Sequence, residues 1–330
     1  MTGDAVSRIG TFACAVFAAA CASGSTEPAK PAAAVAPLTA SVSPEPTKRV
    51  DQRAARGPLS VEAYRFYLRG RLAAIEGDES RAAAELRAAA AAAPDQAPIQ
   101  IALASALLRS GRPRQALAAI EDARRGFPRH AGVSRELGRI YRRLGRPAAA
   151  ARAYQRAIAL DPDGEPSYFG LAAVWLSLGR PDRAEASYRA LLRRRPHSAA
   201  GHYRLGLRLI ERGDHREAER ELRRAVDLDP SHLRARAALA RVLDSVGWLH
   251  FRQGRLREGQ ELLERAARLA PAEPEILWHL GELLLVKGQG RRALELYEQA
   301  RALGPAEPIR RRIDARIQAL RAEMTPPPPG

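Results

Sequence analysis

The stretch AGVSRELGRIYRRLGRPAAAARAYQRAIALDP, residues 131–162, decides the fold of this chain. Leu137 and Tyr141 in its first half are spaced to lie on one face of a helix. Gly145 interrupts that helix, and Pro147 suits the first turn of a second helix, where its missing N–H is not needed. The second helix ends at the closing Asp-Pro pair. The stretch therefore predicts two helices joined by a short turn, and this hairpin cannot bury its apolar faces alone.

The same pattern recurs along the chain. The closing prolines lie 34 residues apart, with one step of 41: Pro94, Pro128, Pro162, Pro196, Pro230, Pro271 and Pro305. The turn glycines keep the same steps: Gly77, Gly111, Gly145, Gly179, Gly213, Gly254 and Gly288. Each copy also has a small residue in both helices and a bulky apolar residue four positions after the second one. Two helices approach closely only where a side chain is small, and the bulky residue fills the remaining space.

These columns resemble the tetratricopeptide repeat family, whose period and residue pattern they share. The resemblance covers residues 59–305 as seven repeats and implies an all-α fold, a right-handed superhelical solenoid of helix hairpins. Residues 306–324 are predicted to form a C-terminal capping helix, with Ile313 and Ile317 on its apolar side. Residues 325–330 form a Pro-rich tail.

The step of 41 residues adds seven residues to one repeat, which is close to two helical turns. We therefore expect a longer first helix there that keeps its apolar face. Gly138 is expected where two helices cross closely, whereas Gly126 and Gly132 are expected to be exposed.

Residues 1–21 are typical of a secretory signal peptide. Arg8 precedes an apolar run, residues 9–20, that is too short to span a bilayer as a helix. The run ends at Cys21, and this ending resembles the signal of bacterial lipoproteins, in which the cysteine carries the lipid. In that family Ala22 after the cysteine favours the outer membrane, while ordinary cleavage to a soluble periplasmic protein is the alternative. Residues 22–58 are predicted to be a disordered Pro/Ala-rich linker.

The chain is strongly basic, with a net charge of +17. Such a charge attracts acidic partners, nucleic acid or anionic lipid. Many arginines, however, cluster near predicted helix ends, where cations interact favourably with the helix dipole. No nucleic-acid motif is present, so we expect no nucleic-acid partner; a cytoplasmic nucleic-acid-binding protein would require residues 1–20 to be retained.

Catalysis is not expected. The seven histidines are spread over the repeats, and no phosphate-binding loop or nucleophile motif occurs. His250 and His279 lie on successive first helices and could approach one another, but no cysteine or paired carboxylate completes a metal set. We expect no cofactor, no metal and no enzymatic activity.

In the resembled family the first helix of each repeat lines a concave groove that holds a partner. The candidate partner-binding residues flank the packing columns of these helices: Tyr64, Tyr67, Arg135, Arg139, Arg142, Phe169, Leu176, Tyr203 and Trp278. Aromatic and apolar residues suit a peptide or an amphipathic helix, and arginines can hold a carboxylate. The expected ligand is a protein or peptide with acidic and apolar side chains. The chain has no asparagine, which argues against the family's carboxylate clamp and asparagine ladder.

The resemblance implies a protein-protein interaction scaffold, a lipoprotein tethered through Cys21 at the bacterial outer membrane and facing the periplasm. Lipoproteins of this family help to assemble secretin pores, pilus machines or polysaccharide exporters. A soluble periplasmic adaptor without lipid is the alternative.

Overall fold

A computed structural model describes residues 60–324, and the predicted signal peptide, linker and Pro-rich tail lie outside this range. The described residues form fifteen α-helices and no strand. In chain order the helices are α1 Val61–Ile75, α2 Glu79–Ala92, α3 Ala97–Arg109, α4 Pro113–Gly126, α5 Ala131–Arg143, α6 Pro147–Leu160, α7 Glu165–Ser177, α8 Pro181–Arg194, α9 Ala199–Arg212, α10 His215–Leu228, α11 Leu233–Arg252, α12 Leu256–Leu269, α13 Pro274–Val286, α14 Gly290–Ala302 and α15 Ile309–Met324. None of them is long and apolar enough to cross a membrane.

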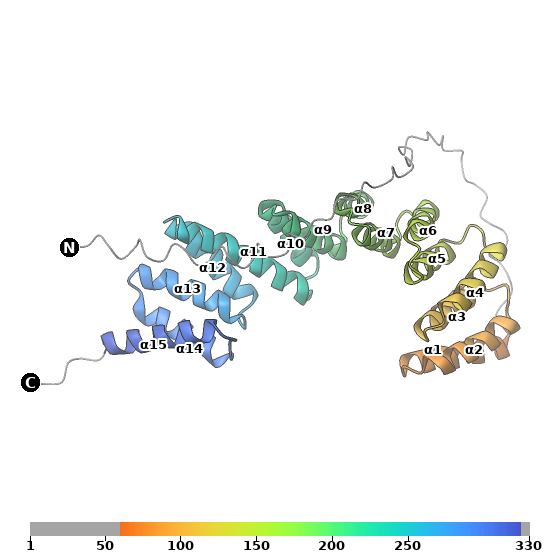
Figure 1. The fold of residues 1–330 in the computed structure, drawn as a ribbon, viewed down its shortest axis with the longest axis horizontal. Helices are drawn as coiled ribbons and strands as arrows, with labels where there is room; N and C mark the ends of the chain where they lie inside the picture. Colours follow the sequence, from red (N-terminus) through yellow and green to blue (C-terminus); the bar gives the residue numbers. More distant parts are fainter. Residues whose placement is uncertain (1–59, 325–330) are drawn as a thin grey trace, which may run out of the picture. The chain divides into compact units, whose positions relative to one another are not determined.

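Helices α1 to α14 follow one another as hairpins in chain order, and α15 comes last (Figure 1). The seven turn glycines have φ between 65° and 88°. This left-handed region is strained for residues with a Cβ atom, which explains the glycine column. The all-α repeat solenoid predicted from the sequence is confirmed, while the handedness of its superhelix stays a prediction.

The small residues lie at close helix crossings, as expected. A Cβ atom on Gly138 in α5 would lie 2.9 Å from the ring of Tyr154 in α6. Tyr154 is itself only 1% exposed, so the ring has little room to move. Gly126 has nothing near its Cβ position, but Gly132 is buried and faces Ile101 of the preceding repeat. The expectation that Gly132 is exposed was therefore wrong, because α5 packs on α3 at this point.

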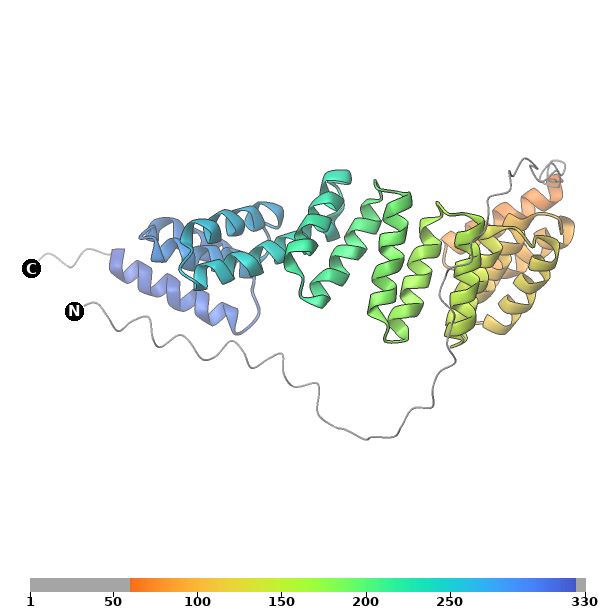
Figure 2. The same cartoon turned by 90° about the horizontal axis from the view of Figure 1, so that it is seen from above.

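Each helix packs on its neighbours in the chain, as the second view also shows (Figure 2). The first helices of successive repeats also contact one another directly, namely α3 with α5, α5 with α7, α9 with α11, and α11 with α13. The seven additional residues lengthen α11 to 20 residues, and Leu243 and Gly247 are both buried along it. The first helices therefore form a shared face whose side chains come from consecutive repeats.

Candidate partner-binding face

One position recurs on the first helices of six of the seven repeats, where none of its members is buried. Its members lie 34 residues apart, or 75 across the long repeat: Tyr67, Ile101, Arg135, Phe169, Tyr203, Trp278 and, on α15, Arg312. Five of the nine predicted partner-binding residues occupy this position. We call the surface around it the first-helix face.

The rings in the middle of this face are held by the next repeat. The guanidinium carbon of Arg204 lies 4.5 Å from the ring centre of Phe169, a cation–π contact. The ring of Tyr203 lies 4.8 Å from that of His232, which precedes α11. Both rings remain partly exposed. They are therefore positioned side chains that still offer apolar surface.

Two other predicted residues of the face are more exposed than these rings. Tyr64 is 51% exposed on α1, and Leu176 is 42% exposed on α7. Tyr67 is partly buried, and its hydroxyl accepts a hydrogen bond of 3.0 Å from Arg71. Exposed apolar side chains at these places can gain contacts from a partner without disturbing the core.

The three predicted arginines of α5 differ in whether they already bind other side chains of the protein. Arg139 donates to Glu136 at 2.8 Å and to the hydroxyl of Ser105 at 3.2 Å. Glu136 is 2% exposed, and Ser105 donates to its other oxygen. Arg139 thus neutralises a buried carboxylate that the sequence analysis missed. Arg135 is partly exposed and Arg142 is exposed, so these two have more freedom to meet a ligand.

Burial is the main cause that raises the pKa of Tyr154, while the nearby charges of Arg142 and Arg139 act in the opposite direction. The hydroxyl therefore stays protonated at physiological pH. Tyr154 therefore packs against α5 as a neutral side chain and places no negative charge beside the arginines.

An aromatic cluster lies at the C-terminal end of the face. The ring centres of Trp278 and Trp248 lie 5.5 Å apart. The guanidinium carbon of Arg312 in α15 lies 5.5 Å from the ring centre of Trp278. The Nε1 atom of Trp278 is buried with no acceptor among the described residues. His279 contacts Asp244 at 2.8 Å and stacks on Trp248. The polar partner of His279 is thus the carboxylate of Asp244. Residues 60–324 contain no group of three His, Cys, Asp or Glu side chains that could hold a metal ion.

Two family models match the sequence. The model of the Cilia and flagella-associated protein 70 C-terminal domain matches residues 129–324, and a tetratricopeptide repeat model matches residues 97–122. No curated protein matches the sequence.

Solved structures resemble this fold at low sequence identity. The C-terminal part of a TPR repeat-containing protein from Cytophaga hutchinsonii is 13% identical, with a TM-score of 0.59, over 75% of this chain and 98% of that one. A tetratricopeptide repeat protein from Parabacteroides merdae is 16% identical, with a TM-score of 0.44, over 79% of this chain and 100% of that one. PilF of Pseudomonas aeruginosa is 15% identical, with a TM-score of 0.46, over 66% of this chain and 96% of that one. At these identities the likeness concerns the fold alone.

Proposed function

Because this chain belongs to the tetratricopeptide repeat family, we propose that it is a non-enzymatic scaffold that binds a partner protein or peptide through its first-helix face. The observation that carries the proposal is the recurring position from Tyr67 to Trp278. It places partly exposed side chains, four aromatic residues, one isoleucine and one arginine, on the first helices of six of the seven repeats. The apolar members of this position pack against the core with part of their surface and leave the rest accessible to a partner.

The partner combines acidic and apolar side chains. Arg135 and Arg142 project from α5 without being buried, and Phe169 and Tyr203 occupy the position of Arg135 in the next two repeats. Carboxylates form strong charge-assisted hydrogen bonds with arginine, whereas rings take up apolar side chains. The net charge of +17 favours the approach of such a partner.

The scaffold is tethered to the periplasmic face of the bacterial outer membrane by a lipid on Cys21. The support for this part of the proposal is the apolar run before Cys21 and the small residues around it. A tether of 37 residues, 22–58, would separate the anchor from the repeats. Assistance in assembling a secretin, a pilus or a polysaccharide exporter would suit this location, and a soluble periplasmic adaptor is the alternative.

A charge-reversal comparison tests the partner-binding face. The partner is first co-purified with the full chain after cross-linking in the cells of origin, and its affinity is then measured for each variant. The double variant Arg135→Glu with Arg142→Glu should weaken binding more than the double variant Arg220→Glu with Arg224→Glu. The second pair lies on the second helix α10 and changes the net charge by the same amount. Equal weakening would mean that general basicity, rather than the first-helix face, attracts the partner.

A further inference from the structure

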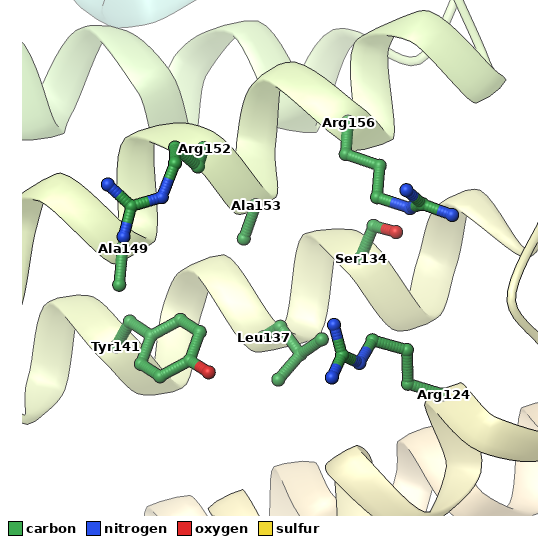
Figure 3. Close-up of a pocket in the computed structure, with 8 residues that line it drawn as sticks. All are labelled: Arg124, Ser134, Leu137, Tyr141, Ala149, Arg152, Ala153 and Arg156. Atoms are coloured by element: carbon green, nitrogen blue, oxygen red, sulfur yellow. The ribbon is translucent and has the colours of Figure 1, made fainter.

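A hollow of about 190 Å³ lies between α4, α5 and α6, away from the first-helix face described above (Figure 3). Leu137 and Tyr141 of α5 form its apolar floor. Arginines border it on both sides, with Arg124 reaching in from α4 and with Arg152 and Arg156 on α6 (Figure 3). The hollow therefore combines an apolar floor with a cationic rim.

The hollow exists because Ser134 is small. At the equivalent position of other repeats, Gln100, Tyr168 and His202 each reach the carbonyl of the proline six residues earlier, at 3.5, 2.9 and 3.0 Å. Ser134 does not make this contact. Instead Arg156 donates to the carbonyl of Pro128 at 2.8 Å, and the space that a larger side chain would fill stays open.

The fifth repeat (residues 197–230) has a carboxylate at a position where the third repeat (residues 129–162) has none. Two repeat lengths after Arg152 and Arg156, the chain again has arginines, Arg220 and Arg224. Two repeat lengths after Ala153, however, it has Glu221, whose carboxylate contacts His202 at 2.7 Å. The fifth repeat thus provides its own carboxylate beside the two arginines, whereas the third repeat keeps the arginines and has an alanine.

The charges of the third repeat are correspondingly unbalanced. Arg124 and Arg152 form no hydrogen bond or ion pair with another residue in the range 60–324. The hydroxyl group of Tyr141 donates a hydrogen bond of 2.9 Å to Glu121. This hydroxyl is therefore already used and offers its proton to no ligand in the hollow. Residues 131–162 contain seven arginines against two acidic residues, and Glu121 of α4 is the carboxylate that lies next to the hollow, where it binds Tyr141. The lining itself contains three arginines and no acidic residue.

We propose that this hollow is a second binding site, which takes an aspartate or glutamate side chain from an acidic segment of a partner protein. The incoming carboxylate would occupy the place that Glu221 has in the fifth repeat, between Arg124 and Arg152. The methylene groups of the segment would pack on Leu137 and the ring of Tyr141. The site is independent of the first-helix face, so either one can fail without the other.

Nuclear magnetic resonance of the arginine side chains tests this site directly. The full chain, labelled with 15N-arginine, is titrated with the peptide acetyl-Glu-Leu-Glu-Leu-Glu-amide and with the same peptide carrying glutamine for glutamate. The Nε–Hε signals of Arg124 and Arg152 should shift with the glutamate peptide and stay in place with the glutamine peptide. Equal shifts of Arg257 and Arg310, two exposed arginines outside both sites, would instead indicate general attraction to the basic surface and would overturn the proposal.

Two variants block the hollow in different ways. Ser134→Tyr fills it with the residue of the next repeat and leaves the charge unchanged, and Ala153→Glu supplies a carboxylate as in the fifth repeat. Each should weaken peptide binding by about tenfold, the loss expected for a hydrogen bond to a charged group. The change Ala190→Glu, on α8 and outside the hollow, is the matched control for charge and should have less effect.

Shifts of the Arg124 and Arg152 signals that survive both changes at unchanged peptide affinity would contradict the proposal. If Ser134→Tyr does not fold, as judged by circular dichroism, Ala153→Glu at the partly exposed rim decides alone. A single-stranded oligonucleotide is titrated in parallel. Shifts of Arg124 and Arg152 that are larger with the oligonucleotide than with the peptide would assign the hollow to nucleic acid and overturn the proposed acidic segment.

Discussion

Arg316 of α15 holds Glu282 of α13 with two hydrogen bonds of 2.7 Å, one to each carboxylate oxygen. Tyr297 of α14 donates to the same carboxylate at 2.7 Å. The side chain of Glu282 is 13% exposed, so it is largely shielded from water. Burial and the adjacent Glu282 raise the pKa of Tyr297, which keeps its hydroxyl protonated as the donor. One carboxylate thereby joins the last repeat to the capping helix.

We predict that Arg316→Ala loosens α15. The change removes two of the three hydrogen bonds that Glu282 accepts in a shielded place. The loss should cost about 1–2 kcal/mol, because the partial exposure of Arg316 allows water to compensate in part. Urea denaturation measures the loss, and hydrogen exchange should locate it in α15. Arg310→Ala is the matched control, because Arg310 is exposed and makes no ion pair within residues 60–324. Equal effects of the two changes would contradict the clamping role.

Gly138→Leu should destabilise the protein by about 1–3 kcal/mol or more, because even a Cβ atom would meet the ring of Tyr154. Gly126→Leu, at an open helix end, is the control and should change stability little. Thermal melting of both variants checks this. Unchanged melting of Gly138→Leu would refute the close crossing of α5 and α6.

The stability supplied by His202 should depend on pH. Burial alone would lower the pKa of His202, but hydrogen bonds with Glu221 and with the carbonyl of Pro196 outweigh it and raise that pKa. The two ring nitrogens face acceptors at 2.7 and 3.0 Å, so only the protonated ring can donate to both. The resulting stabilisation is complete below the unfolded pKa of about 6.5 and is lost as the pH rises through the raised folded value.

The variant His202→Gln isolates this effect, since Gln100 already occupies the equivalent position in another repeat. The difference in unfolding free energy between wild type and variant should be larger at about pH 5.5 than at about pH 8.5. A difference that is constant, or that grows toward alkaline pH, would show that a neutral ring makes these contacts.

Mass spectrometry of the mature N-terminus should find an acylated Cys21, and Cys21→Ser should release the protein from membranes. A lipid contributes about 0.8 kcal/mol per buried methylene group, so its loss should be evident in a simple fractionation. An unmodified terminus that begins beyond Cys21 would favour the soluble periplasmic adaptor instead.

The fold could be predicted from the sequence because its decisive residues act locally. Gly145 and Pro147 set the backbone of one turn, and their recurrence identifies the other turns without any knowledge of distant contacts. The lengthening of α11 follows in the same way from counting residues between prolines.

The contacts between repeats were harder to predict. Arg316 of the capping helix binds Glu282, 34 residues earlier. Arg139 likewise meets Ser105, also 34 residues earlier. A comparison of residues one repeat length apart would have indicated both pairs. The hollow depends on Ser134 being smaller than its counterparts, so it becomes visible only when side-chain volumes are compared across repeats.

Site-specific photo-cross-linking tests the proposed partner-binding face most directly. A photoreactive phenylalanine derivative is introduced at Tyr64, Leu176 or Tyr203 on the first helices, and at Glu261 or Glu295 on second helices remote from the hollow. After irradiation in the cells of origin, the three first-helix positions should be joined to one and the same protein, and the two control positions should not. Cross-links to that protein from Glu261 and Glu295, with none from the first-helix positions, would contradict the account.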